Sequence, residues 1–300
     1  MPTYVGRFAP SPTGPLHLGS LVCALASYLD ARSRGGRWLL RIEDIDPPRE
    51  QAGASELIIA SLREHGLRWD GDIQWQSRHR PRYVQALKTL DQLGLTYRCS
   101  CSRQRLRDLN GVYDGHCLRH PPKYDRPCAI RINVSAALAH LGIEEISFDD
   151  RLQGPQREDF SASGDLIVFR RDGLFAYHLA VICDDAADGV SDVVRGCDLL
   201  NSSGAQILLL RLLGHPPPRF AHIPMVCDEH GDKLSKQTHA APLDNQHARA
   251  NLQMALRALN LGDCPLGLDI SRSLAWAVEH WSPHALVRRQ KISLASLSAK

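Results

Sequence analysis

The feature that most constrains the fold is a strand-like segment, a rigid turn and a helix-like segment in direct succession near the start of the chain. The stretch "YVGRFA" has the pattern of a short buried strand, and apolar residues recur at helical spacing between Leu18 and Leu29. Three prolines in "PSPTGP" restrict the backbone between the two, and the glycine among them is typical of a turn. A second strand, "RWLLRIED", follows, and this alternation predicts an α/β fold with a parallel sheet.

Two further helices are predicted from capping residues and apolar spacing. Asp46 is a candidate cap, and Pro47 would stand in the first turn of a helix that runs to about Leu62. Another helix is expected roughly from Pro81 to Leu93.

A stretch of different composition interrupts these regular segments. Residues 99–172 are rich in cysteine, proline, arginine and aspartate and show weak periodicity, so we expect an insertion there. It would divide the parallel-sheet domain into two parts, 1–98 and 173–238. The remaining residues, 239–300, predict a small helical C-terminal domain.

The turn "TGPLHLGS" lies where an open parallel sheet binds ligands. The free N–H groups at the start of the following helix favour an anion. His17, Gly19 and Ser20 are therefore candidate phosphate-binding residues. The alternative is a stiff turn with a surface histidine. Neither a GxxxxGK[ST] loop nor a GxGxxG motif occurs in the chain.

A second basic stretch, "GDKLSKQT", occupies 231–238. Lys233 and Lys236 are mobile point charges suited to a triphosphate, and Ser235 offers a hydroxyl. Taken alone, such lysines are typical of a solvated surface loop.

Three cysteines in the insertion have the spacing of a metal site. Cys99 and Cys101 form C-x-C and Cys117 follows, so three thiolates and a fourth ligand could bind one structural Zn²⁺. His116 and His120 are the fourth ligands that general preference favours. The alternative is a set of reduced thiols.

The composition excludes some classes of protein. Nine cysteines, an odd number in a chain of 300 residues, argue against a secreted disulfide framework. No apolar run is long enough to cross a bilayer. The net charge of +3 permits a nucleic-acid partner without requiring one. We therefore expect a cytoplasmic protein that makes no membrane contact. No exposed apolar stripe is evident, so we also expect a monomer.

The two phosphate-binding candidates together resemble signatures of a known family. "HLGS" is similar to the HIGH motif and "KLSKQ" to the KMSKS loop of class I aminoacyl-tRNA synthetases, although Leu234 and Gln237 replace the loop's methionine and last serine. The order of "RFAPSPTGPLHLG", "RIEDID" and "YHLAVICDDAADGVSDVVRGCDLL" resembles the glutamyl branch, from Pro2 to Thr238. The resemblance implies a Rossmann-like catalytic domain that uses ATP with Mg²⁺.

The resemblance also implies roles for individual residues. His17, Lys233 and Lys236 would be catalytic, and His17, Gly19, Ser20 and Lys236 would bind the nucleotide. L-Glutamate needs two cationic groups, a carboxylate and hydroxyls, which Arg7, Ser11, Glu43, Tyr177 and Arg195 supply. The family assigns Glu43 to the ammonium group, and the carboxylate that each arginine binds stays open. In the structural alternative, Glu43 joins the cluster of Asp44 and Asp46, and Arg195 pairs with Asp192 or Asp198.

The C-terminal residues and the cysteine pattern indicate which group within the glutamyl branch the chain resembles most. Only 62 residues follow Thr238, fewer than an anticodon-reading domain of usual size, so we expect that domain to be absent. The pattern C-x-C-x11-Y-x3-C makes the chain similar to the glutamyl-queuosine tRNA(Asp) synthetases. That resemblance implies Tyr113 as the fourth zinc ligand and tRNA(Asp) carrying queuosine as the partner.

Three other functions compete with this one. The nearest is a shortened glutamyl-tRNA synthetase that charges the tRNA 3′ end. The second is another HIGH-containing nucleotidyltransferase that makes an adenylate of a small metabolite. The third is an RNA-binding module without catalytic activity, held together by zinc.

Overall fold

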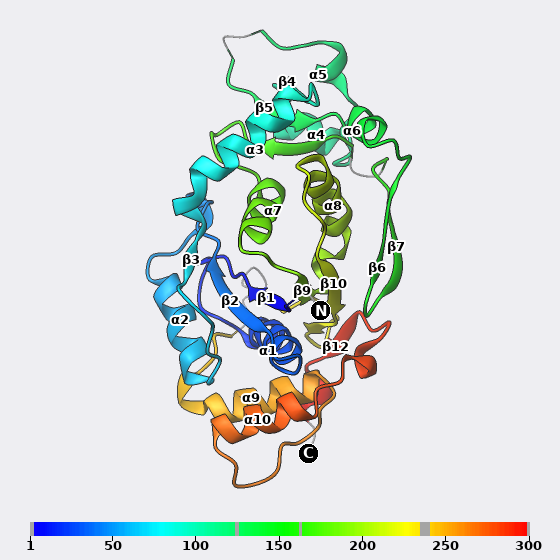
Figure 1. Cartoon of the computed structure of the whole chain (residues 1–300). Helices are drawn as coiled ribbons and strands as arrows, with labels where there is room; N and C mark the ends of the chain where they lie inside the picture. The colour runs from blue at the N-terminus through cyan, green and yellow to red at the C-terminus, as the bar shows by residue number, and fades with distance from the viewer. Residues whose placement is uncertain (1–2, 124–125, 162–163, 235–240, 299–300) are drawn as a thin grey trace.

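The computed structural model describes residues 3–123, 126–161, 164–234 and 241–298. Its centre is a set of parallel strands (Figure 1). Strand β1 (Val5–Phe8) pairs with β2 (Arg37–Ile42), which pairs with β3 (Gln74–Trp75). Strand β9 (Asp192–Gly196) pairs with β10 (Arg219–Ile223).

Strand β9 lies beside β1, so the two parallel ladders form one layer. The Ser191 backbone N–H donates to the Val5 carbonyl at 2.9 Å. The Val5 N–H in turn donates to the Ser191 hydroxyl at 3.0 Å. The chain thus moves outward from β1 on one side to β2 and on the other to β9, which is the strand order that creates a ligand crevice between β1 and β9.

Helices cover both faces of this layer because the strand side chains alternate. Trp38 and Leu40 of β2 belong to the apolar core around α1 (Leu18–Arg32). Leu39 belongs to a second core, on the side of α7 (Tyr177–Ala187).

The remaining helices divide between these two cores. Helices α9 (Ala248–Ala258) and α10 (Ile270–Glu279) pack against α1 and share its core. Helices α3 (Arg80–Gln92) and α8 (Ser203–Leu212) pack with α7 in the second core.

An antiparallel sheet, drawn at the top of Figure 1, lies mostly in the segment expected to be an insertion, but it begins at Thr96, before the expected start at residue 99. It consists of β4 (Thr96–Cys99), β5 (Ala129–Ile132) and β8 (Leu166–Phe169). A separate hairpin of β6 (Ile146–Asp150) and β7 (Gly154–Glu158) reaches back toward β10. The other elements are α2 (Ala54–Glu64), α4 (Arg103–Asp108), α5 (His116–Arg119), α6 (Val134–His140), β11 (Met225–Cys227), β12 (Lys291–Ser293) and α11 (Ala295–Ser298).

The helix expected from Pro47 to Leu62 is wrong in its first part. Residues Pro47–Arg49 make one short 3-10 turn, and α2 begins only at Ala54. Gly53 has φ +77°, a left-handed conformation that interrupts any helix passing through it. Asp46 caps no backbone N–H with its side chain and instead forms ion pairs with Arg49 and Arg170.

Candidate functional site

A cavity of about 420 Å³ opens where β1 and β9 end. Backbone contacts fix the wall that follows β1: the Pro10 carbonyl accepts from the Glu43 N–H at 3.0 Å. Gly14 has φ +138°, a conformation that favours glycine in this tight turn.

The structure brings most of the residues singled out from the sequence to this one cavity. The lining includes Arg7, Ser11, His17, Gly19, Ser20, Glu43, Tyr177, Arg195 and Lys233. Lys236, expected to be catalytic and nucleotide-binding, lies outside the described residues, as does Ser235.

His17 stands directly before α1 and caps it. Its Nδ1 accepts a hydrogen bond from the Ser20 N–H at 3.3 Å, and the side chain is buried. A Cβ on Gly19 would lie 3.1 Å from the His17 ring and 3.5 Å from the Leu234 carbonyl. The first turn of α1, with its N–H groups, therefore lies against the segment that carries Lys233.

Lys233 lies at the edge of the cavity, across from His17 and the start of α1. Its Nζ forms an ion pair with the Asp198 carboxylate at 2.5 Å, and both residues line the cavity. The Leu234 N–H donates to the Val226 carbonyl at 2.9 Å, which fixes the chain on which Lys233 sits.

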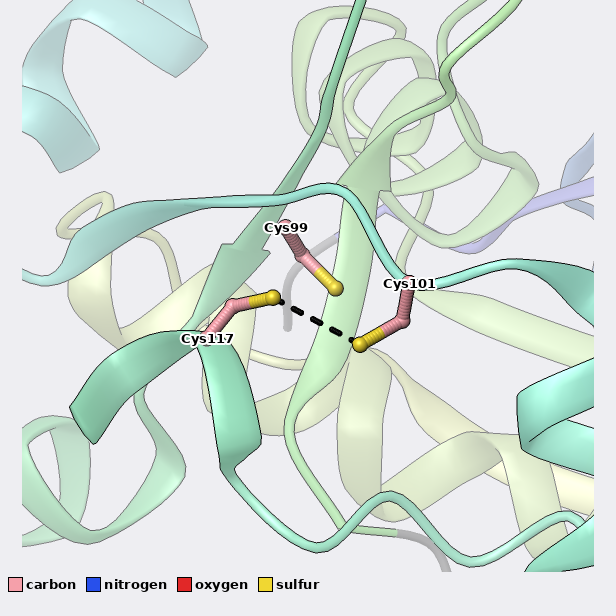
Figure 2. A group of neighbouring side chains, drawn as sticks. All are labelled: Cys99, Cys101 and Cys117. Atoms are coloured by element: carbon pink, nitrogen blue, oxygen red, sulfur yellow. Dashed lines mark hydrogen bonds between the residues drawn. The ribbon is translucent and has the colours of Figure 1, made fainter. Parts of the chain in front are cut away.

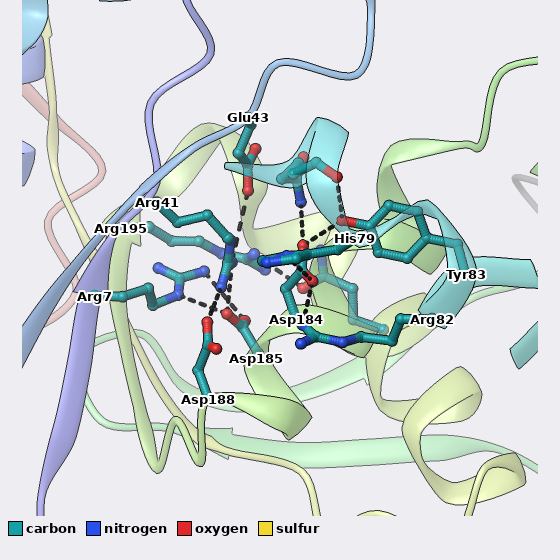
Figure 3. Close-up of polar contacts among 12 residues, drawn as sticks. Arg7, Arg41, Glu43, His79, Arg82, Tyr83, Asp184, Asp185, Asp188 and Arg195 are labelled. Carbon is teal, nitrogen blue, oxygen red and sulfur yellow. Dashed lines mark hydrogen bonds and ion pairs between the residues drawn. The ribbon is translucent and has the colours of Figure 1, made fainter. Parts of the chain in front are cut away.

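Arg7 is held by a buried network of charges (Figure 3). Its Nε donates to Asp185 at 3.3 Å, and the same carboxylate accepts from Arg41 at 2.6 Å. Arg41 also contacts Asp188 at 3.4 Å. Burial disfavours a charged Asp185, but Arg41 and Arg7 lower its pKa below the ordinary value.

Glu43 is buried at the end of β2 and faces Arg41 at 3.6 Å. Burial raises the pKa of Glu43 to about 7, although Arg41 and Arg7 act in the opposite direction. Among the described residues its Oε1 has no hydrogen-bond donor. A cation placed in the cavity would supply one, and it would favour the ionised carboxylate.

Glu43 does not pack with the acidic residues near it in sequence. Asp44 accepts hydrogen bonds from the Ser77 backbone N–H and hydroxyl, and Asp46 pairs with arginines. The structural alternative considered for Glu43 is therefore wrong.

Arg195 is buried, and its side-chain hydrogen-bond partners are neutral groups. It donates to His222 and Gln206 at 2.9 Å each and to Ser203 at 2.8 Å. Within the described part of the chain it forms no ion pair with a carboxylate. A buried guanidinium with this surrounding fits an anionic ligand.

The structural alternative considered for Arg195 is also wrong. Asp192 pairs with Arg219 at 2.8 Å, and Asp198 pairs with Lys233. Neither carboxylate is therefore the partner of Arg195.

The three insertion cysteines gather as the spacing predicted. Their sulfur atoms lie within 4.8 Å of one another, and Figure 2 shows them pointing to a common point. The Sγ atoms of Cys101 and Cys117 are 3.5 Å apart, far longer than a disulfide. Three soft sulfur donors at this separation could hold a metal ion, because tetrahedral zinc with thiolates spaces the sulfurs by about 3.8 Å.

Tyr113 lies within the same buried cluster as Cys99 and Cys117. Its hydroxyl oxygen accepts from the Cys117 backbone N–H at 2.7 Å. His116 and His120 stack on each other with ring centroids 4.8 Å apart. Among the described residues, neither histidine joins the group of potential ligand atoms.

Comparison with known proteins decides the family. The sequence matches the family described as tRNA synthetases class I (E and Q), catalytic domain, over residues 4–260. The chain belongs to this family of class I tRNA synthetases.

Among relatives in this family, the glutamyl-Q tRNA(Asp) synthetase of Serratia proteamaculans is 47% identical over 294 residues, which are 97% of this chain and 94% of that one. The protein of the same name from Pseudomonas aeruginosa is 45% identical over 291 residues, covering 95% and 96% of the two chains.

Solved structures of tRNA synthetases share this fold. The glutamate tRNA ligase of Elizabethkingia meningosepticum superposes with a TM-score of 0.77 at 23% identity, over 98% of this chain and 68% of that one. The α/β fold with a parallel sheet, expected from the sequence, is confirmed. Among the helices in the described ranges, none is both long and apolar enough to cross a bilayer.

Several residues around the cavity were not found from the sequence. These residues do not line the cavity but contact, directly or through one another, side chains that do. Asp185, itself bound by Arg41, contacts Arg7. His222, itself bound to Asp150, contacts Arg195. The acidic run "CDDAADG" was visible, but no spacing rule links it to Arg41, which lies 144 residues away from Asp185.

Proposed function

We propose that this protein activates L-glutamate with ATP and transfers the glutamyl group to the queuosine base of tRNA(Asp). The observation that carries the proposal is that five side chains suited to glutamate lie around one cavity with the HIGH-like turn. The names of the relatives from Serratia and Pseudomonas support the choice of tRNA(Asp) as acceptor.

In the proposed binding mode, cationic and anionic groups of the cavity match those of glutamate. Arg7 and Arg195 receive the two carboxylates and Glu43 receives the ammonium group. Ser11 and Tyr177 complete the pocket with hydroxyl groups. Arg195 gains a charged partner on binding, and Oε1 of Glu43, which makes an ion pair with Arg41 but no hydrogen bond within the described residues, gains a donor.

In the first proposed step, a glutamate carboxylate attacks the α-phosphorus of ATP and pyrophosphate leaves. ATP enters with Mg²⁺, which neutralises phosphate charge. His17, Gly19 and Ser20 face the phosphates from the start of α1, and Lys233 faces them from the cavity edge that carries Asp198. Lys236 is assigned to the phosphates from its place in the KMSKS-like sequence alone. The chain acts by positioning the reactants and stabilising charge.

In the second proposed step, a hydroxyl of the queuosine ring attacks the carbonyl carbon of the mixed anhydride. AMP leaves with the electrons of the broken bond, and its phosphate accepts the hydroxyl proton. In this proposal the same cavity serves both steps.

We also propose that Cys99, Cys101, Cys117 and Tyr113 hold one structural Zn²⁺. The three converging sulfurs support this assignment, as does the Tyr113 oxygen, which already accepts a backbone N–H from Cys117. Four ligands leave no open position, so zinc would stabilise the insertion without taking part in the reaction. The protein would act in the cytoplasm as a monomer.

Glutamate-dependent exchange of pyrophosphate into ATP tests the first step. We expect exchange with L-glutamate and none with L-aspartate or L-glutamine. The Lys236→Ala variant should lose exchange by about a hundredfold or more, because its ammonium stabilises the transferring phosphates. Full exchange by this variant would remove Lys236 from the proposal.

Labelled glutamate with purified tRNA tests the acceptor. We expect label on tRNA(Asp) that carries queuosine and none on the matched tRNA(Asp) that carries guanosine at that position. Nuclease digestion and mass spectrometry should locate the label in the anticodon fragment. Label at the 3′ end of tRNA(Glu) would instead support a shortened glutamyl-tRNA synthetase.

A further inference from the structure

Behind Arg195 lies a buried pair of side chains that no step of the proposed reaction uses. His222 of β10 is the direct ladder partner of Arg195 of β9. Its Nδ1 lies 2.6 Å from the carboxylate of Asp150, the last residue of β6. The His222 side chain is wholly inaccessible to solvent.

The hydrogen-bond pattern fixes the protonation of His222. The Nε of arginine always carries a hydrogen, and Arg195 donates it to Nε2 of His222 at 2.9 Å. Nε2 must therefore be the unprotonated nitrogen, so Nδ1 carries the hydrogen and donates it to Asp150.

Asp150 is itself held by the backbone. Its Oδ1 accepts N–H groups from Leu152 at 2.9 Å, Gln153 at 2.8 Å and His222 at 3.2 Å. Only Oδ2 is left for the His222 ring, so the carboxylate has little freedom to turn.

Arg195 is thereby clamped in one orientation. Nε donates to His222, Nη1 to Gln206, and Nη2 to Ser203 and the Leu199 carbonyl. Nη1 carries two hydrogens and donates one of them within the described residues, so one N–H remains for a ligand in the cavity that Arg195 lines.

From this geometry we propose that Asp150 and His222 are positioning residues for glutamate: they hold the Arg195 guanidinium where it receives a substrate carboxylate. The inference rests on the proposed function of the cavity. It gives the β6–β7 hairpin, which belongs to the insertion, a role in amino-acid binding.

The Asp150→Asn variant tests the chain of hydrogen bonds. The backbone N–H groups keep the amide oxygen of the new side chain, so its NH₂ group faces Nδ1 of His222. The histidine then has to place its hydrogen on Nε2, where it opposes the Nε hydrogen of Arg195. We expect the KM for glutamate to rise by about tenfold or more, the loss typical of a broken charged hydrogen bond, with the KM for ATP changed less than about twofold.

Two variants of His222 give an independent comparison. His222→Gln keeps an amide oxygen that accepts from Arg195 and an NH₂ that donates to Asp150. His222→Leu removes both. We expect His222→Gln to stay within about threefold of wild type in KM for glutamate, and His222→Leu to resemble Asp150→Asn.

Asp30→Asn is the matched control. Asp30 is also a buried carboxylate in an ion pair, with Arg151 at 2.7 Å, but it does not line the cavity. The substitution should lower thermal stability without changing the KM for glutamate. Glutamate-dependent exchange gives all the KM values, and circular dichroism checks that each variant is folded.

The outcomes separate this inference from the proposed function. Wild-type protein without glutamate-dependent exchange would overturn both. The inference alone would be overturned if the wild type is active but the KM for glutamate in Asp150→Asn and His222→Leu stays within about twofold of its value in Asp30→Asn. It would also be overturned if His222→Gln raises the KM for glutamate as much as His222→Leu does. If Asp150→Asn does not fold, the two His222 variants decide the question.

Discussion

Arg41 donates a 2.6 Å hydrogen bond to Asp185, and neither side chain lines the cavity whose charges they hold in place. Asp185 also forms an ion pair with Arg7, so one carboxylate is the counter-charge of two buried guanidinium groups. This relationship makes the cavity sensitive to a residue that touches no proposed substrate.

We predict that Asp185→Asn lowers the free energy of unfolding by about 3–5 kcal/mol, because it leaves buried cations without this counter-charge. Urea unfolding followed by circular dichroism measures the change. Asp172→Asn is a suitable control, since Asp172 forms an exposed ion pair with Arg170 and its loss should cost less than about 1 kcal/mol. Equal losses in the two variants would contradict the prediction.

Arg7→Lys should separate glutamate binding from ATP binding. Lysine keeps the positive charge but loses the planar fork that binds a carboxylate and Asp185 together. We expect the KM for glutamate to rise by about tenfold or more and the KM for ATP to stay within about twofold. Parallel exchange titrations of each substrate measure this, and an equal rise in both KM values would remove Arg7 from the glutamate pocket.

Glutamate binding should depend on pH through Glu43. Burial raises the pKa of Glu43 to about 7, so the free protein gains a proton there as the pH falls through 7. An ammonium group binds the ionised form, and the KM for glutamate should therefore rise as pH falls, approaching about tenfold per pH unit below 7. Above that value the dependence should flatten. In Glu43→Gln the KM should be high at every pH, and a wild-type profile in this variant would refute the assignment.

Metal analysis tests the proposed zinc site. We expect about one zinc per chain, lost on prolonged treatment with a strong chelator or in Cys117→Ser. Loss of zinc should make the segment between Cys99 and Cys117 sensitive to limited proteolysis, because three thiols alone cannot hold it closed. Cys264→Ser, which changes a half-buried thiol far along the chain, should retain the metal.

Substitutions of Tyr113, His116 and His120 distinguish the candidates for the fourth zinc ligand. Tyr113→Phe should weaken zinc binding by about tenfold or more, whereas His116→Ala and His120→Ala should leave it unchanged. Competition with a coloured zinc chelator measures the affinity. Weaker binding in a histidine variant alone would assign that histidine in place of Tyr113.

The sequence was sufficient for the parts of the fold that depend on local patterns. The strand before the turn and the helix after His17 follow from apolar spacing. The helix expected from Pro47 was wrong because capping residues do not reveal the left-handed φ of Gly53 further along the segment. Local pattern also brought the three cysteines together, since C-x-C and Cys117 lie in one short segment.

The supports of the site depend on contacts that no local pattern records. Asp150 and His222 are 72 residues apart in sequence and come from the β6–β7 hairpin and a strand of the parallel layer. Arg41 was visible in "RIEDID", but its partner Asp185 is fixed only when α7 packs across the sheet. Such pairings follow from tertiary packing, which spacing arguments do not reach.

Helix α1 contributes to both the site and the core. Its first turn borders the cavity, and its apolar side packs on α9 and α10. Leu25 and Leu256 lie in the same solvent-free core. A shortened fragment that ended after the cavity residues would leave this side of α1 in contact with water. Anyone who wishes to produce a minimal enzyme for crystallisation or engineering must therefore retain α9 and α10, or redesign the surface that they cover.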